Sequence, residues 1–162
     1  MPEPAHVALD VVIDAPVDRV FEAFSEWEQQ GRWMLGTRVH VSRGDGRSVG
    51  SELAAWSGAG PAGFWDTMRI TRWEPPYRVD VLHTGKVVKG TGTMEVVALP
   101  GGRSRFVWSE DLELPWGAVG RLGWPLARPA FLLGVKRSLE AFGRLVEAGS
   151  LPVGSASGGA GR

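Results

Sequence analysis

One carboxylate stands on a strand face that is otherwise mostly apolar. Residues 103–114 alternate between apolar and polar types, as a strand with one buried face does. If Trp108 faces inward, Glu110 faces inward with it. The same face then also carries Ser104, Phe106, Leu112 and Leu114. Burial raises the pKa of an unpaired carboxyl group, which can then act as a general acid. The alternative is a Glu110 near a cavity mouth, hydrated or paired with an arginine.

A histidine on a neighbouring strand could complement this carboxylate. Residues 78–83 place Val79, Val81 and His83 on one face. If that face is the inner one, His83 lies a strand or two from Glu110, and the pair could do acid/base work or recognise a polar ligand group. Asp66 is a third candidate. The alternative for His83 is a purely structural role.

Strand 64–73 is the hardest to phase. One face carries Phe64, Asp66, Met68 and Ile70, and we expect it to point inward. The other face carries Trp65, Thr67, Arg69, Thr71 and Trp73.

Two glycines are predicted on the inner face of strand 87–98. That face carries Val88, Gly90, Gly92, Met94 and Val96. Glycine removes side-chain volume where a core is normally filled, so the pattern favours a cavity. Local curvature of the sheet is the alternative, because glycine also permits it.

Other chemistry is excluded or disfavoured. The chain has no cysteine, which excludes disulfides and thiolate chemistry. Its three histidines are far apart, so we predict no metal site, and it lacks phosphate-binding loops and a nucleophile elbow, so we predict no cofactor. Eighteen basic and eighteen acidic residues give zero net charge, which does not favour nucleic acid. Without a signal peptide or an apolar membrane span, the expected location is the cytoplasm.

The order of elements predicts an α+β fold. Residues 6–13 form a strand, and a helix follows from Pro16 with a short second helix near Trp33. Six further strands are predicted at 38–43, 47–56, 64–73, 78–83, 87–98 and 103–114. A Gly-rich loop is expected at 57–63, and a Gly/Pro-rich connection, with a short helical turn as one alternative, at 115–128. A long amphipathic helix is expected at 129–148, beginning near Pro129. We expect one domain over residues 1–149 and a disordered Gly/Ser-rich tail over 150–162.

Several segments together resemble the START/Bet v 1-like (SRPBCC) superfamily. They are Ile13-Asp-Ala-Pro16 with Val20-Phe21-Glu-Ala-Phe24 and Trp33, then Trp73-Glu-Pro-Pro-Tyr-Arg-Val79, the hairpin before Trp108, and the terminal helix. The resemblance implies a helix-grip fold, in which a curved seven-stranded antiparallel sheet wraps around a long C-terminal helix and encloses a hydrophobic cavity. Members bind lipids, sterols or polyketides, and some catalyse polyketide cyclisation or aromatisation. The bacterial polyketide cyclase/dehydrase or lipid-transport-like branch is the most similar, and no complete catalytic set from a known cyclase matches this chain.

Three functions follow as hypotheses. The first is a carrier or sensor that binds an apolar small molecule in the cavity. The second is a polyketide aromatase/cyclase in which Glu110 and His83 are catalytic. The third is a partner-docking protein that uses Trp116 and Trp124. Monomer and homodimer both remain open. The expected ligand-binding residues are Trp33, Met68, His83, Gly92, Met94, Phe106, Trp108, Glu110, Phe131 and Val135.

Overall fold

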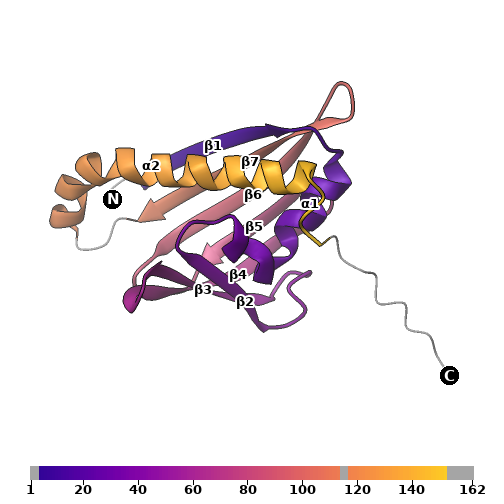
Figure 1. Cartoon of the computed structure of the whole chain (residues 1–162). Coiled ribbons are helices and arrows are strands. Elements are labelled where there is room, and N and C mark those ends of the chain that lie inside the picture. The colour runs from indigo at the N-terminus through magenta and orange to yellow at the C-terminus, as the bar shows by residue number, and fades with distance from the viewer. Residues whose placement is uncertain (1–3, 114–116, 153–162) are drawn as a thin grey trace.

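A seven-stranded antiparallel sheet curves around one long helix (Figure 1). The computed structural model describes residues 4–113 and 117–152. The elements are β1 (Ala5–Ile13), α1 (Val17–Ser25), the 3-10 helix η1 (Trp27–Arg32), β2 (Thr37–Arg43), β3 (Glu52–Ala59), β4 (Ala62–Glu74), β5 (Arg78–His83), β6 (Lys89–Leu99), β7 (Arg103–Glu113) and α2 (Ala118–Glu147). The strand order is β1-β7-β6-β5-β4-β3-β2, so β1 and β2 form the two edges. This is the predicted α+β helix-grip fold.

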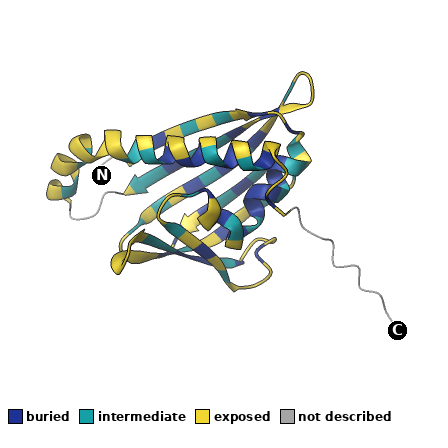
Figure 2. Ribbon diagram, in the orientation of Figure 1, coloured by how far each residue is buried: buried dark blue, intermediate teal, exposed yellow. Residues whose placement is uncertain are grey.

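The core lies between the concave face of the sheet and the two α-helices (Figure 2). Alternate residues of the strands point into it, as their period of two requires. Phe24 of α1, Phe106 of β7 and Phe142 of α2 are fully buried, and the ring centroid of Phe106 lies 5.1 Å from that of Phe24 and 5.0 Å from that of Phe142. This aromatic group joins both helices to the sheet at one end of the molecule.

The inward phases predicted for β5, β6 and β7 are confirmed. Val79, Val81 and His83 of β5 are buried, and so are Gly92, Met94 and Val96 of β6. Ser104, Phe106 and Glu110 of β7 are buried as well, whereas Leu114 lies outside the described residues.

The inward phase of β4 is also confirmed, with one correction. Asp66 and Ile70 are buried, as predicted. Trp73 was predicted on the outer face, but the pairing with β5 shifts between Ile70 and Arg72. One extra residue at this bulge reverses the side on which later residues point. Trp73 consequently packs against Phe21, with ring centroids 5.3 Å apart.

One of the predicted loops, the Gly-rich segment, is partly regular structure. β3 continues to Ala59 and β4 begins at Ala62, so most of the segment 57–63 is a hairpin and not a loop. Gly58 and Gly63 face each other there, and a Cβ on Gly58 would lie 2.2 Å from the carbonyl oxygen of Ala62. Glycine therefore permits the close approach of the two strands.

The terminal helix begins eleven residues before its predicted start. α2 starts at Ala118 and contains Pro125 and Pro129, which were expected to lie before the helix or at its beginning. Each proline removes one helical N–H donor. The carbonyl groups left without a donor are those of Arg121 and Pro125, and both residues are exposed, so these carbonyls can bind water. Neither α1 nor α2, nor any other described helix, contains a stretch able to cross a bilayer.

The domain extends slightly beyond its predicted boundary at residue 149. Leu151 is buried in the core cluster, and the backbone carbonyl of Ser150 accepts a hydrogen bond of 2.7 Å from Arg32. The beginning of the predicted tail is therefore part of the packed domain. The rest of that prediction, residues 153–162, lies outside the described residues.

Candidate functional site

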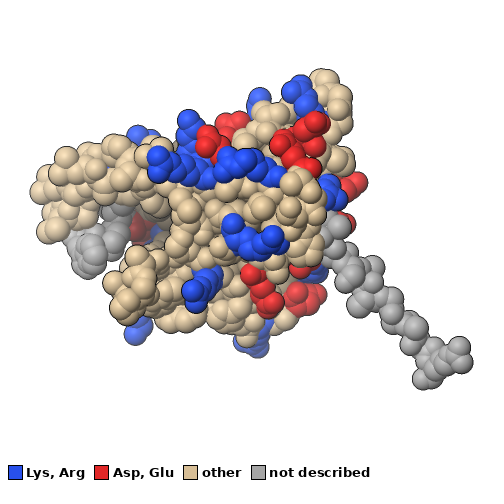
Figure 3. Space-filling view, in the orientation of Figure 1, with Lys and Arg blue, Asp and Glu red and all other residues tan. Residues whose placement is uncertain are grey.

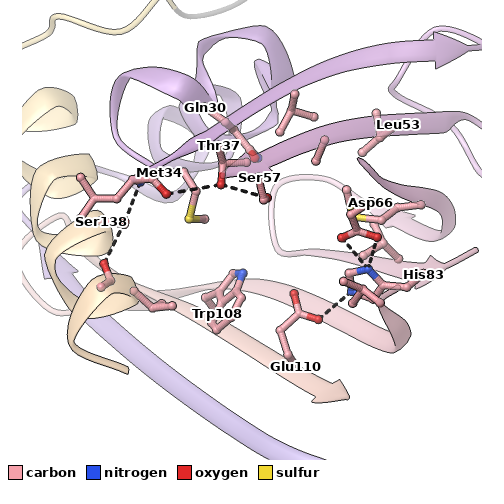
Figure 4. Close-up of a pocket in the computed structure, with 18 of the residues that line it drawn as sticks. Gln30, Met34, Thr37, Leu53, Ser57, Asp66, His83, Trp108, Glu110 and Ser138 are labelled. Atoms are coloured by element: carbon pink, nitrogen blue, oxygen red, sulfur yellow. Dashed lines mark hydrogen bonds and ion pairs between the residues drawn. The ribbon is translucent and has the colours of Figure 1, made fainter. Parts of the chain in front are cut away.

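A cavity of about 390 Å³ lies between the concave sheet, η1 and α2 (Figure 4). Most of its wall is apolar and comes from residues that are distant in sequence. The apolar lining includes Met34, Leu53, Met68, Val81, Met94, Trp108, Phe131 and Val135. Its volume falls in the range of small-molecule sites, about 300–1,000 Å³.

Three ionisable side chains meet at one side of this cavity. His83 Nδ1 lies 3.0 and 2.9 Å from the two carboxylate oxygens of Asp66. His83 Nε2 lies 2.8 Å from Glu110 Oε2. The three residues come from β5, β4 and β7, and Figure 4 shows the imidazole between the two carboxylates. The side chains of His83, Asp66 and Glu110 are only 4%, 12% and 10% exposed.

Two glycines allow His83 and Glu110 to meet across the strand between them. β6 separates β5 from β7, with His83 paired to Gly90 and Glu110 paired to Gly92. A Cβ on Gly92 would lie 2.9 Å from Glu110 Oε1. A Cβ on Gly90 would lie 1.9 Å from the carbonyl oxygen of Asp111, so this glycine serves the close approach of β7. The predicted inward glycines therefore make room for the cluster and for the neighbouring backbone.

The hydrogen bonds define the charge of the imidazole. Each ring nitrogen faces a carboxylate oxygen, and a doubly protonated ring can donate to both. Burial alone would lower the pKa of His83, but the hydrogen bonds and charges of Asp66 and Glu110 outweigh it and raise the pKa to about 9. His83 is accordingly an imidazolium at neutral pH.

Glu110 differs from the other two members because one of its oxygens is free toward the cavity. Burial raises the pKa of its carboxyl group, and the hydrogen bond from His83 opposes that rise. Among the described residues only its Oε2 has a hydrogen-bond partner, while both oxygens of Asp66 face His83. Oε1 of Glu110 is therefore the atom of the cluster that can donate a proton to a bound molecule or accept one from it.

A second set of polar side chains lies on the wall away from this cluster. Ser138 of α2 accepts a hydrogen bond of 3.0 Å from the backbone N–H of Leu35 and donates one of 2.9 Å to the carbonyl of Gly134. Thr37 and Ser57 have hydroxyl oxygens 3.3 Å apart across β2 and β3. These residues are absent from the predicted set, because neither strand was assigned an inward face. Ser138 interrupts the apolar stripe of the terminal helix, and this was the one feature of the sequence that could have indicated a polar group on this wall.

Seven of the ten predicted ligand-binding residues line the cavity. They are Met68, His83, Met94, Trp108, Glu110, Phe131 and Val135.

The other three predicted residues do not line it. Trp33 is buried against Phe142, with ring centroids 4.7 Å apart, because the chain leaving η1 turns this side chain into the core. Phe106 has the predicted phase but lies deeper, at the end where α1 fills the space above the sheet. Gly92 lies beneath the Glu110 carboxylate, which separates it from the open space.

The aromatic residues proposed for partner docking have different outcomes. Trp124 is half-buried and packs against Phe131, with ring centroids 5.6 Å apart. Trp116 lies outside the described residues. Within those residues no group of three or more side chains could hold a metal ion. In the cluster, both ring nitrogens of His83 already face carboxylates.

The family model described as "Polyketide cyclase / dehydrase and lipid transport" matches residues 4–147. The chain belongs to this family. Because the match spans nearly all of the described residues, it covers every element of the cavity wall. No curated protein is similar enough in sequence to count as a relative.

Solved structures with the same fold include two that are described as aromatase/cyclases. TTHA0849 from Thermus thermophilus has a TM-score of 0.76 at 17% identity, over 90% of this chain and 99% of that one. The Zhui aromatase/cyclase from Streptomyces sp. R1128 has a TM-score of 0.74 at 15% identity, over 96% and 98%. The di-domain aromatase/cyclase BexL of the BE-7585A biosynthetic pathway has a TM-score of 0.70 at 19% identity, over 91% of this chain and 48% of that one. At these identities the likeness concerns the fold.

Proposed function

We propose that this protein binds an apolar small molecule in the cavity and holds a polar group of that molecule at Glu110. The observation that carries the proposal is the position of Glu110 Oε1, a carboxylate oxygen without a protein partner among the described residues, on an otherwise apolar wall. Apolar walls with a few convergent polar groups are typical of small-molecule sites. A hydroxyl or a carbonyl group on the ligand suits this oxygen, which accepts when ionised and donates when protonated.

Native mass spectrometry of freshly purified protein tests this proposal. The expected result is an adduct in a one-to-one ratio that organic extraction releases as an apolar compound. The same ligand should bind more weakly to Glu110→Gln, whose amide has nearly the same shape but neither the charge nor the acidity. A wild-type protein that binds no apolar compound, either from its host or from a panel of fatty acids, sterols and aromatic polyketides, would overturn the proposal.

Acid/base catalysis is a second candidate, and the Asp66–His83–Glu110 cluster is the observation that favours it. Glu110 would accept a proton from a ligand carbon that lies between two carbonyl groups. That carbon would then bond to a second carbonyl carbon of the same chain, and Glu110 would return the proton to the new alkoxide. His83 and Asp66 would act as positioning residues, because the ring nitrogens of His83 are both engaged. This is the ring closure expected of a polyketide cyclase.

The two candidates separate in a reconstituted reaction. A chain with several carbonyl groups, bound as a thioester, is incubated with wild-type protein, Glu110→Gln and His83→Gln. A cyclase loses its characteristic product with Glu110→Gln and shows an altered pH profile with His83→Gln. If both variants give the wild-type product distribution, the protein binds such a molecule without transforming it.

A further inference from the structure

Helix α2 changes character along its outward face. From Lys136 to Glu147 this face is charged, whereas the opposite face packs into the core. In the first half of α2 the same outward face is apolar and exposed. Its members are Val119, Leu122, Leu126 and Leu133, which are 70%, 78%, 85% and 48% exposed. Their spacing of three, four and seven residues places them on one side of the helix. We call these four residues the outer stripe.

The outer stripe points away from the cavity. Trp124 and Phe131 lie on the opposite side of α2, where Phe131 also approaches Trp108, with ring centroids 6.3 Å apart. If this half of the helix bent toward the sheet, Trp124 and Phe131 would be buried, but the outer stripe would stay in water. A closing movement of the helix therefore cannot cover the stripe, and only a surface outside the domain can.

The stretch of chain that carries the stripe has charge of one sign. No acidic residue occurs between Glu113 and Glu140, whereas Arg121, Arg128, Lys136 and Arg137 occur there, in a chain whose net charge is zero. Figure 3 shows the projecting end of α2 as a lobe with little charge on the face in view, while Lys and Arg gather along the middle of the helix. This local excess of positive charge favours an anionic surface as the one that covers the stripe. A second copy of this chain would bring another stretch of the same charge against it, which is unfavourable.

We propose that the outer stripe docks on an anionic lipid surface, to which the cations of the same helical stretch are attracted. Arg121 and Arg128 lie on the side of α2 that carries Trp124 and Phe131, and a helix with exposed Leu and Val on one face and Arg on another suits the boundary between lipid headgroups and acyl chains. The binding is interfacial, since α2 has no membrane-spanning stretch. Ala130, Phe131 and Gly134, adjacent along the same helix, line the cavity. Docking through the outer stripe would therefore place α2 between the bilayer and the cavity, with the cavity one helix away from the lipid. The docking itself does not rest on the proposed function.

Vesicle co-sedimentation tests the docking itself. The full chain is mixed with vesicles of phosphatidylcholine alone, or of phosphatidylcholine with about one third phosphatidylglycerol. We expect binding to the anionic vesicles only, and weaker binding as ionic strength rises from about 0.1 to about 0.5 M. Leu122→Glu combined with Leu126→Glu should weaken it by about tenfold or more, and Arg121→Gln with Arg128→Gln should also weaken it. Leu82→Glu is the matched control, because Leu82 is an exposed leucine on the sheet and 40% accessible.

Several results would overturn the proposal. No sedimentation with anionic vesicles, or equal sedimentation of wild-type protein and the double glutamate variant, overturns the proposal. If the wild type is a dimer, the double glutamate variant is a monomer, and vesicles do not compete with dimerisation, the stripe is a self-association surface. Capture of an acidic protein without vesicle binding would assign the stripe to that partner instead. Thermal unfolding of each variant checks that the fold is intact. Titration of the cavity with an apolar probe in the absence of vesicles separates failure of docking from failure of ligand binding.

Discussion

Gly92 of β6 leaves open the space that the carboxylate of Glu110 fills. A Cβ at position 92 would lie 2.9 and 3.0 Å from the two oxygens of that carboxylate, and 3.0 Å from Cγ2 of Val81. Those distances are shorter than a methyl group tolerates, so the side chain of Glu110 keeps its place only while residue 92 has none. The contact between Glu110 and His83 therefore depends on a residue that takes no part in it.

Gly92→Ala should displace the Glu110 carboxylate and weaken its hydrogen bond to His83. The expected loss is about 1–3 kcal/mol of unfolding free energy, measured in urea, because both the overpacking and the disturbed ion pair are buried. Thr91→Ala is the control, since Thr91 precedes Gly92 on the same strand and is exposed. If both variants unfold at the wild-type urea concentration, position 92 does not hold the cluster in place.

The strand phases could be predicted from sequence because burial alternates along each strand. Once Trp108 faces inward, the period of two also places Phe106 and Glu110 inward. Where one extra residue interrupts the period, the same reasoning fails, and the bulge before Arg72 reversed the predicted direction of Trp73 in this way. A bulge depends on pairing with the neighbouring strand, which the alternation of a single strand does not contain.

The site was only partly predictable for the same reason. His83 and Glu110 could be placed on inward faces, but the contact between them depends on the strand order and register that set Gly90 and Gly92 between them. The early start of α2 was missed because Pro125 and Pro129 are unfavourable inside helices. Local propensity argues against a helix there, and the observed helix overrides it.

The pKa of His83 gives a prediction for stability as a function of pH. Its pKa rises from 6.5 to about 9 in the folded protein, so folding favours the protonated ring. This contribution is fully present below pH 6.5 and is lost as the pH rises through about 9; by linkage it is on the order of 3 kcal/mol. Glu110, whose pKa burial also raises, contributes in the same direction at lower pH.

His83→Gln should remove the fall in stability between about pH 6.5 and 9. Unfolding free energies measured in urea at several pH values test this, with His40→Gln as the control because His40 is an exposed histidine on β2. The variant should also be less stable than the wild type at neutral pH, since it leaves two buried carboxylates without their shared cation. A wild-type profile that is flat over this range, or a drop that persists in His83→Gln, contradicts the assignment.

Gly134 offers a way to fill the cavity without changing its polar groups. It lines the cavity from α2, and a Cβ added there would meet nothing within 4 Å. Gly134→Leu should therefore place its side chain in the space of the ligand and weaken binding of an apolar fluorescent probe by about tenfold or more, by the loss of buried contact area. Gly134→Ala should keep binding and gain about 0.5–1 kcal/mol of helix stability.

Gly123→Leu is the matched control for Gly134→Leu. Gly123 is in the same helix, and its Cβ would also meet nothing within 4 Å, but it is not part of the cavity wall. Both variants gain helix propensity, so a difference in probe binding reports the cavity alone. Equal probe affinities of wild type and Gly134→Leu would mean that the probe binds elsewhere.

Leu151 tests where the folded domain ends. This side chain is 3% exposed and belongs to the core cluster, although it follows the helix-ending Gly149 and lies in a segment whose composition predicted disorder. Leu151→Ala should lower the unfolding free energy by about 2–5 kcal/mol, because it removes a buried side chain that the surroundings only partly replace. Urea unfolding measures the loss, and Pro152→Ala, at the exposed neighbouring position, is the control. A Leu151→Ala variant with the wild-type midpoint would restore the predicted boundary at residue 149.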